Sequence, residues 1–214
     1  MMDSYYTVNQ PIIRAKRIFD VSLSLIGLLL TLPLFPFIAL AIKLNSKGPV
    51  FYRQLRVGKA MPDQVDVFEM IKFRSMIQDA EVVTGATLAT KGDARVTLVG
   101  KFLRKTRLDE LPQFFNVLNG DMSLVGPRPE RPTFYNKLEQ EIPYFSERTY
   151  GVLPGITGLA QVNQGYDTCI EDVRSKVGFD HSYALSLSSI SSWIKSDMYI
   201  LLMTVKVMFF ARGQ

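Results

Sequence analysis

An apolar stretch without a charged residue covers residues 21–42 and dominates the N-terminal part of the chain. At 1.5 Å per residue it predicts a helix of about 33 Å, which is long enough to cross the hydrocarbon core of a bilayer. Pro33 and Pro36 fall inside the stretch, and each removes a backbone hydrogen bond and favours a kink. The pattern therefore predicts a membrane helix that is broken near Pro33.

Basic residues flank this stretch on both sides: Arg14, Lys16 and Arg17 before it, then Lys43, Lys47, Arg53, Arg56 and Lys59 after it. Because cytoplasmic flanks are enriched in lysine and arginine, both ends of the helix are expected on the cytoplasmic face. A re-entrant helix, which enters the membrane and returns to the same face, is consistent with the length of the apolar stretch and with the basic residues on both of its sides. A simple span satisfies the length, so the pattern leaves both forms open. A signal peptide fits poorly because no small-residue cleavage site follows the stretch.

Two short strands are expected after the membrane helix, at residues 50–54 and 65–71, because both are rich in β-branched and aromatic residues. A turn at residues 46–49 precedes the first strand, and a loop at residues 58–63 separates the two. The pattern predicts a small β-hairpin. The polar residues 79–91 that follow are expected to be a linker with the beginnings of a helix.

Helical spacing returns in the second half of the chain. Residues 93–97 are expected to lead into a helix that carries Lys101 and Arg104, and this helix turns three apolar side chains toward the core: Leu98, Phe102 and Leu103. A further helix is expected to begin at Pro112 and to stop at Gly120. From residue 190 onward one more apolar stripe has helical spacing: Trp193, Ile194, Met198, Leu201, Leu202, Val205, Met208 and Phe209. This last helix is expected to pack on the core, to lie in the membrane interface, or to do both.

These elements predict an α+β fold that is mostly α. It comprises a re-entrant N-terminal membrane helix, a small β-hairpin, a helical core and a C-terminal amphipathic interfacial helix. We expect residues 1–47 to form an N-terminal arm and the membrane helix. Residues 48–214 are expected to form a domain on the cytosolic face, with interfacial helices.

Composition narrows the possible functions. Hydrophobic residues make up 47% of the chain, and the single Cys169 excludes an intramolecular disulfide and suits a reducing compartment. The 25 basic and 20 acidic residues leave a mild positive excess, much of it near the apolar stretch. This placement suggests anionic lipid headgroups and phosphorylated substrates as partners, and not nucleic acid. His181 is the only histidine, which argues against a histidine-rich metal cluster.

Asp109 and Glu110 are the candidate catalytic residues. They directly follow a basic run and precede the helix expected at Pro112, so they would lie at a helix N-terminus, where free N–H groups favour anions. One carboxylate can act as a nucleophile while its neighbour, here Glu110, binds a divalent cation. An acidic first turn on a solvent-exposed helix is the alternative reading of an isolated Asp-Glu pair.

The candidate phosphate-binding residues are cationic side chains in the same part of the sequence: Arg104, Arg128, Lys72, Arg74 and Arg95. Arg128 stands between Pro127 and Pro129, which are expected to hold it in a rigid loop. Lys72 and Arg74 flank Phe73, an arrangement that is also typical of a surface strip with snorkelling side chains. The glycine-rich residues 154–162 lack the Gly-Lys-Ser/Thr ending of a P-loop and are either a substrate wall or a structural turn.

The chain resembles the bacterial sugar transferase family, the monotopic phosphoglycosyl transferases, through motifs that recur in order along nearly its whole length. The matching segments are residues 16–20, 42–44, 48–51, 72–74, 108–113, 116–118, 120–129 and 155–162, which read KRIFD, IKL, GPVF, KFR, LDELPQ, NVL, GDMSLVGPRP and GITGLAQV. This resemblance implies an enzyme at the cytoplasmic face of the bacterial inner membrane. Such an enzyme transfers a sugar-1-phosphate from a UDP-sugar to undecaprenyl phosphate, releases UMP and initiates polysaccharide or glycoconjugate assembly.

The resemblance also implies roles for individual residues. Asp109 matches the nucleophile that forms a covalent aspartyl-phosphosugar intermediate, and Glu110 matches the residue that binds Mg²⁺. Arg104 and Arg128 match phosphate-contacting cations, and Lys72 is a further candidate. Many members have serine before the helix-breaking proline where this chain has Leu32, so Thr31 or a water is expected to replace that hydroxyl.

In this chain no multi-span region precedes the matching segments, so it resembles the small, single-domain form of the family. The transferred sugar, the glycan pathway and the oligomeric state are not encoded in any motif, although residues 155–180 are expected to form the wall that recognises the sugar. Two alternatives remain: a non-catalytic membrane-anchored scaffold, and another phospholipid-active phosphotransferase or phosphatase.

Overall fold

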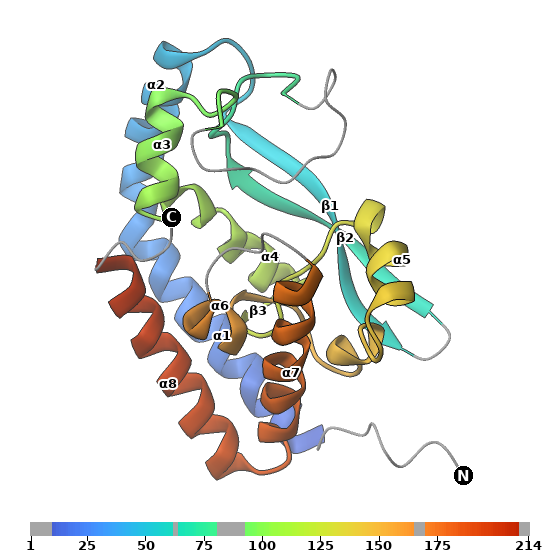
Figure 1. Ribbon diagram of the computed structural model, residues 1–214. Helices are drawn as coiled ribbons and strands as arrows, with labels where there is room; N and C mark the ends of the chain where they lie inside the picture. The colour runs from blue at the N-terminus through green and yellow to red at the C-terminus, as the bar shows by residue number, and fades with distance from the viewer. Residues whose placement is uncertain (1–9, 62–63, 81–92, 165–169, 210–214) are drawn as a thin grey trace.

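The chain begins with a long apolar helix that is interrupted once. The computed structural model describes residues 10–61, 64–80, 93–164 and 170–209, and it places α1 at Gln10–Thr31 and α2 at Phe35–Asn45. A 3-10 turn at Leu32–Leu34 separates them, because Pro33 and Pro36 cannot donate the hydrogen bonds that a continuous α-helix needs. Figure 1 shows that α2 continues beyond α1 and does not fold back along it. The Thr31 hydroxyl donates to the carbonyl of Gly27, one turn before the interruption, at 2.7 Å.

The predicted hairpin is present and is longer than expected. Strands β1 (Phe51–Met61) and β2 (Gln64–Phe73) pair antiparallel, from Phe51 opposite Phe73 to Met61 opposite Gln64. The expected loop at residues 58–63 was wrong, because residues 58–61 belong to β1. The register shifts between Val57 and Ala60, so the residues between them form a bulge that lets the strand continue. The linker expected at residues 79–91 lies mostly outside the described residues.

Two helices with a 3-10 turn between them follow the hairpin along the chain: α3 (Leu98–Lys105), η2 (Leu108–Glu110) and α4 (Gln113–Asn119). The Thr97 side chain caps α3 by accepting from the N–H of Gly100 at 2.9 Å. The expected stop after α4 is confirmed, since Gly120 takes a left-handed conformation with φ of 95°.

The expected core face of α3 was correct for Leu103, which is buried, and wrong for Leu98 and Phe102, which are 75% and 60% exposed. The helix packs instead through Gly100, where an added Cβ would lie 1.9 Å from the carbonyl oxygen of Ser75. This close approach turns the face of Gly100 and Leu103 inward and the face of Leu98 and Phe102 outward.

The remaining elements wrap around a short parallel pair of strands, β3 (Ser123–Val125) and β4 (Gly155–Thr157). The others are α5 (Pro132–Glu141), η3 (Ser146–Thr149), α6 (Leu159–Asn163), α7 (Ile170–Ser186) and α8 (Ile190–Phe209). Figure 1 shows α8 lying beside α1, with α5 next to the far half of the hairpin.

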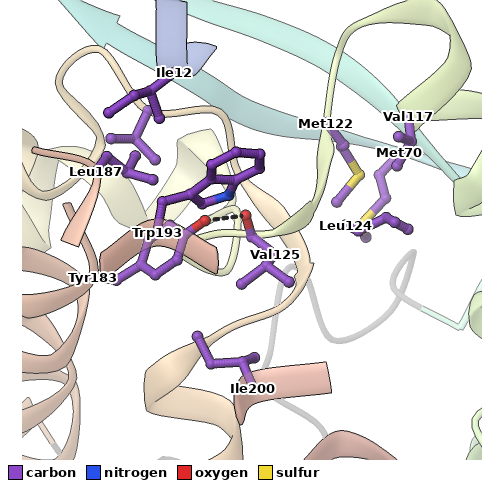
Figure 2. Close-up of a cluster of buried hydrophobic side chains, with 11 residues drawn as sticks. Ile12, Met70, Val117, Met122, Leu124, Val125, Tyr183, Leu187, Trp193 and Ile200 are labelled. Carbon is purple, nitrogen blue, oxygen red and sulfur yellow. Dashed lines mark hydrogen bonds between the residues drawn. The ribbon is translucent and has the colours of Figure 1, made fainter. Parts of the chain in front are cut away.

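The main hydrophobic core lies where α1, β3, α7 and α8 meet. Figure 2 shows Tyr183 and Trp193 at its centre, with Ile12, Leu187, Val125 and Ile200 around them. The Tyr183 hydroxyl lies 2.9 Å from the carbonyl oxygen of Val125 and 2.9 Å from Oδ1 of Asp197. The core therefore contains polar groups that form hydrogen bonds with one another.

A buried ion network runs through this core. The Lys16 ammonium lies 2.7 Å from Oδ2 of Asp197 and 3.6 Å from Oδ1 of Asp20, and all three side chains are 10% exposed or less. Asp20 also accepts from the Ser123 hydroxyl at 2.8 Å and from the N–H of Leu124 at 3.2 Å. These contacts tie the N-terminal helix to α8 and to β3.

The apolar stripe of α8, for which core packing, the membrane interface or both were expected, packs on the core at Trp193 but not along much of its length. Trp193 and Ile200 are buried, but five other apolar side chains of the helix are 42–66% exposed: Ile194, Met198, Leu202, Val205 and Met208. The helix contacts the rest of the chain along the line of Trp193, Asp197 and Ile200, so most of its apolar surface faces outward.

Candidate active site

The two adjacent carboxylates lie in the 3-10 turn η2, immediately before α4. Arg107 introduces this turn in a left-handed conformation with φ of 58°, and Pro112 stands at the N-cap of α4. The expected helix therefore begins at Gln113, one residue after Pro112. The N–H of Glu110 is already bonded to the carbonyl of Arg107, so the expectation that free helix N–H groups surround the dyad was wrong for this residue.

Three cations converge on one oxygen of Glu110. Oε1 lies 2.8 Å from Nζ of Lys72, 3.8 Å from Nη1 of Arg128 and 4.0 Å from Nη1 of Arg107. These residues come from the end of β2, from the loop after β3 and from the start of η2. The fold thus brings two of the predicted phosphate-binding residues, Lys72 and Arg128, to the dyad.

Asp109 is the more deeply buried of the two carboxylates, with 6% of the residue exposed. Its Oδ1 is buried and has no hydrogen-bond partner among the described residues. Arg104 lies close enough for its charge to lower the pKa of Asp109, and its Nε donates to the Ser75 hydroxyl at 2.9 Å. An orphaned buried oxygen beside several cations is unusual in a purely structural carboxylate.

The surroundings move the two carboxyl pKa values in opposite directions. Burial and the charge of Glu110 raise the pKa of Asp109, and the cations Lys72, Arg104 and Arg107 offset only part of this rise. Burial alone would also raise the pKa of Glu110, but Lys72, Arg128 and Arg107 lower it to about 2. Glu110 is therefore ionised throughout the physiological range, whereas Asp109 titrates at a higher pH than an ordinary aspartate. Separated pKa values in one pair of carboxylates are typical of catalytic sites.

The loop that carries Arg128 is held along its whole length. Backbone hydrogen bonds join Gly126 N to Thr157 O and Gly155 N to Pro127 O, so β4 fixes the beginning of the loop. An added Cβ at Gly155 would lie 2.1 Å from the nitrogen of Gly126, and this explains the glycine there. The glycine-rich residues 154–162 are therefore largely a structural support for the loop.

The far half of the loop is held from two other sides. Arg148 donates to the Arg128 carbonyl at 3.3 Å, and Arg56 donates to the Pro129 carbonyl at 2.9 Å. The N–H of Val57 in turn bonds the carbonyl of residue 130 at 2.8 Å. Four successive carbonyls, from residue 127 to residue 130, thus accept a hydrogen bond, which agrees with the rigid loop predicted from the two prolines.

Two predicted phosphate-binding residues serve other partners. Arg74 is 5% exposed and donates to the carbonyls of Lys47 and Ser46, both at 2.7 Å, so it fixes the turn before β1. Arg95 holds Asp93 with Nε 2.9 Å from Oδ1 and Nη2 2.6 Å from Oδ2, and this pairing contributes most to lowering the pKa of Asp93 to about 2. No contact among the described residues joins Arg74 or Arg95 to the dyad.

The prediction omitted one residue that the fold places at the site, Arg107. It belongs to the basic run directly before the dyad, so the signal was present in the sequence. Its role depends on the left-handed backbone at this position, which returns the side chain toward Glu110 three residues later. A positive φ at an arginine is not visible in a residue pattern.

The donors at the dyad fit a magnesium ion of the kind that takes one or two carboxylates and completes its shell with water and substrate phosphate. Glu110 is ionised, and Asp109 offers an oxygen without a partner among the described residues. In the described part of the chain, this site included, no group of three or more His, Cys, Asp or Glu side chains could hold a metal ion. Any divalent ion at this site would therefore depend on the phosphate that binds with it.

A small pocket opens beside Arg128, between its loop, α6 and α7. Gln161, Lys176 and Asp180 line it, and the ion pair between Arg148 Nη1 and Asp180 Oδ2, at 2.7 Å, forms part of its wall. Several of these residues fall in the region 155–180 where a sugar-recognising wall was expected.

The family model for bacterial sugar transferases matches residues 12–211. This match covers most of the chain, and it includes the dyad, the cations around it and the loop of Arg128. The chain belongs to the bacterial sugar transferase family. The resemblance inferred from the motifs is thereby confirmed.

Several relatives are similar to this bacterial sugar transferase. A UDP-N-acetylgalactosamine-undecaprenyl-phosphate N-acetylgalactosaminephosphotransferase of Aeromonas hydrophila is 47% identical over 191 residues, which are 89% of this chain and 43% of the relative. A UDP-glucose:undecaprenyl-phosphate glucose-1-phosphate transferase of Escherichia coli (strain K12) is 43% identical over 89% of this chain and 39% of the relative. A putative undecaprenyl-phosphate N-acetylgalactosaminyl 1-phosphate transferase of Bacillus subtilis (strain 168) is 50% identical over 62% of this chain and 72% of the relative. The chain thus spans about two fifths of the first two relatives and most of the third.

Proposed function

We propose that this protein transfers a sugar-1-phosphate from a UDP-sugar to undecaprenyl phosphate and releases UMP. The observation that carries the proposal is the arrangement at η2, where a buried aspartate with a free oxygen adjoins a glutamate that is surrounded by three cations. Relatives that share 43–47% of their aligned residues with this chain are named for undecaprenyl-phosphate sugar-phosphate transfer, which supports the same reaction class.

The proposed reaction is a double displacement at phosphorus. Oδ1 of Asp109 attacks the sugar-linked phosphate, the bond to the UMP oxygen breaks, and an aspartyl-phosphosugar intermediate forms. A phosphate oxygen of the lipid then attacks that phosphorus, the bond to Asp109 breaks, and the lipid diphosphate-sugar leaves. Because both partners of each step are anionic, the cations Lys72, Arg104 and Arg128 are needed to reduce their repulsion and to stabilise charge in the transition state.

Asp109 must be ionised to attack, and its raised pKa keeps the carboxylate basic and reactive once it has lost its proton. Glu110 would hold Mg²⁺ through its carboxylate, together with phosphate oxygens of the donor. Bound there, the ion would neutralise phosphate charge. The ionised state of Glu110, maintained by its three cationic neighbours, is the form that this role requires.

We further propose that residues 1–47 are the membrane part and that the rest of the chain, residues 48–214, lies at the cytoplasmic face. Among the described residues, Gln10–Asn45 is the segment long and apolar enough to cross a bilayer, and most of its surface is not covered by protein. Exposed side chains on α1 and α2 include Leu25, Leu29, Leu30, Phe37 and Leu40. The exposed apolar side of α8 extends this surface and makes an amphipathic interfacial helix, with its buried side on the core.

The basic residues on both flanks make the re-entrant form of this helix our preferred topology, although α2 continues beyond α1 without folding back. Single cysteines at positions 10 and 46, placed in a Cys169→Ser background, are expected to react with a membrane-impermeant maleimide from the same side of sealed inner-membrane vesicles. Labelling of the two positions from opposite sides would contradict the re-entrant form and support a span.

The experiment that tests the reaction is UMP release from a panel of UDP-sugars with undecaprenyl phosphate and Mg²⁺. UDP-N-acetylgalactosamine and UDP-glucose come first, because the names of the relatives contain both sugars. We expect one donor to release UMP and Asp109→Asn to abolish release, with thermal stability and membrane association unchanged. Near-normal turnover by Asp109→Asn would refute the nucleophile, and release of inorganic phosphate from the lipid without UMP would indicate a phosphatase.

A further inference from the structure

Arg56 is a partly buried cation next to the loop of Arg128. It lies on β1, on the same side of the hairpin as Lys72, since Arg56 pairs with Phe68 and Tyr52 pairs with Lys72 in the antiparallel register. Its Nη1 donates to the Pro129 carbonyl at 2.9 Å and its Nη2 donates to Oε1 of Gln54 at 2.6 Å. Both acceptors are neutral, so the guanidinium charge is not balanced by either bond.

Among the residues that the structure describes, Arg56 has no close counter-ion. No carboxylate of a described residue lies within ion-pair distance of it, and its buried Nε has no hydrogen-bond partner there. A guanidinium has five N–H donors, of which the bonds to Pro129 and Gln54 use only part. A buried donor without a partner costs free energy, and a buried unpaired charge costs more, so such groups commonly have an anionic partner.

The neighbours of Arg56 increase this charge imbalance. Burial is the main reason that the pKa of Arg56 falls to about 10, and the positive charges of Arg128 and Arg131 lower it further. Glu130 acts in the opposite direction, but its Oε1 lies 3.9 Å from Nη2 of Arg148 and is shared with that residue. The positive charges of Arg128, in the loop, and of Arg131, directly before α5, therefore both act on Arg56.

We propose that Arg56 and Arg128 form a second phosphate subsite beside the Asp109-Glu110 dyad. Arg128 connects the dyad with Arg56. Its Nη1 lies 3.8 Å from Oε1 of Glu110, and the next residue along the chain, Pro129, accepts a hydrogen bond from Arg56. A bound phosphate would accept from the N–H donors of the two Arg56 Nη groups that the bonds to Pro129 and Gln54 leave unused.

The subsite rests on the proposed function, which brings more than one phosphate group to the site. While Asp109 engages the sugar-linked phosphate, the donor presents a second phosphate on its nucleotide side. The acceptor lipid presents a phosphate monoester in the second half-reaction. The shared chemistry is a phosphate group that a cluster of guanidinium groups recognises, and the two sources are distinguished by experiment.

Two substitutions separate binding by charge from support of the loop. Arg56→Gln removes the charge and keeps a hydrogen-bond donor, whereas Arg56→Lys keeps the charge and loses the forked contact with Pro129 and Gln54. Arg53→Gln is the matched control, because Arg53 lies on the opposite side of the same strand with 63% of its side chain exposed and pairs with the exposed Glu69.

Two measurements distinguish the sources of the phosphate. Calorimetry gives the affinity for UMP and for uridine, which lacks the phosphate, and so tests the nucleotide arm. The KM for undecaprenyl phosphate at saturating donor measures the acceptor arm.

If the nucleotide phosphate is the ligand, Arg56→Gln weakens UMP binding about 10- to 100-fold, the range expected for a charge-assisted hydrogen bond. Uridine binding stays unchanged, Arg56→Lys retains most of the affinity, and Arg53→Gln resembles the wild type. If the acceptor is the ligand, the same charge dependence appears in the KM for undecaprenyl phosphate and not in UMP binding.

Three results would overturn the subsite: Arg56→Lys failing as badly as Arg56→Gln, equal losses for UMP and uridine, or no change in either arm. The first two would indicate a residue that only supports the loop. Failure of the proposed function would look different, because the wild type would then release no UMP with any UDP-sugar.

Discussion

The buried lysine of the core provides a quantitative test of how the N-terminal helix is attached. Replacing Lys16 with methionine keeps the length and apolar stem of the side chain but removes the ammonium group. Asp197 and Asp20, which lie 2.7 Å and 3.6 Å from it, then remain in the core with 1% and 2% of their side chains exposed. The variant should therefore carry two buried carboxylates without their shared cation.

Removing one partner of a buried ion pair typically costs about 3–5 kcal/mol, because the other charge is left uncompensated. For a chain of this size, about 1 kcal/mol lowers the midpoint of thermal unfolding by about 2–4 °C, so Lys16→Met should lower it by about 6–20 °C. The hydrogen bonds that Tyr183 and Trp193 make with Asp197 remain and limit the loss.

The fluorescence of Trp193, the only tryptophan in the sequence, is a direct readout, because its indole N–H donates to Oδ2 of Asp197 at 2.8 Å. Unfolding of the detergent-solubilised protein can be followed through this signal. Lys195→Met, on the exposed side of the same helix, is the control and should change the midpoint little. A double-mutant cycle with Asp197→Asn should show that the second substitution costs less once Lys16 is gone. A loss below about 1 kcal/mol, or additive losses in the cycle, would show that the network does not stabilise the protein as argued.

Two further predictions concern the turn η2 and the loop beside it. Because the pKa of Asp109 is raised and the proposed attack needs its ionised form, the rate of UMP release should fall as the pH drops through that pKa. Lys72→Gln removes a cation that lowers this pKa, so the acidic limb of the pH–rate profile should move to higher pH, whereas Lys101→Gln, on the exposed side of α3, should leave it in place. A limb that stays in place in Lys72→Gln would contradict the assigned interaction. Gly155→Ala would place a Cβ 2.1 Å from a backbone nitrogen, so it should lower stability by about 1–3 kcal/mol and slow UMP release. Gly178→Ala, where nothing lies within 4 Å of the added Cβ, should instead stabilise α7 by up to about 1 kcal/mol, and equal effects of the two substitutions on thermal unfolding would refute this explanation.

Local patterns in the sequence were sufficient for the elements that depend on neighbouring residues. The proline pair predicted an interrupted N-terminal helix, Gly120 predicted the end of α4, and β-branched residues predicted the hairpin. Each of these features follows from backbone chemistry within a few residues. The length of β1 was underestimated because a bulge lets a strand continue through a glycine that resembles a loop residue.

The partners of the cationic residues depend on tertiary contacts and could not be obtained in this way. Lys72 and Arg74 are two residues apart, yet Lys72 reaches Glu110 while Arg74 turns to the carbonyls of Ser46 and Lys47. The difference arises because β2 ends at Phe73, so the alternation of the strand no longer controls the direction of Arg74. Nothing in the local sequence encodes the turn that receives it.

The same limit applies to the apolar faces. Leu98 and Phe102 have the spacing of a core face, but the close approach of Gly100 to the backbone of Ser75 sets the orientation of α3. A strongly apolar composition also makes core-facing and lipid-facing residues indistinguishable, as on α8. Where a protein has two apolar environments, periodicity locates the apolar side of a helix but does not identify what covers it.

The buried ion network and the loop of Arg128 are connected through β3. Asp20 of the N-terminal helix binds Ser123 and Leu124 at the start and middle of β3, and Tyr183 contacts the carbonyl of Val125 at its end. The loop of Arg128 begins at the next residue and is held from there by β4, Arg148 and Arg56. The position of Arg128 relative to Glu110 therefore depends on contacts that start in the helix proposed to sit in the membrane. If that helix sits in the membrane as proposed, the same contacts fix Arg128 relative to the bilayer surface, where the proposed lipid acceptor would present its phosphate.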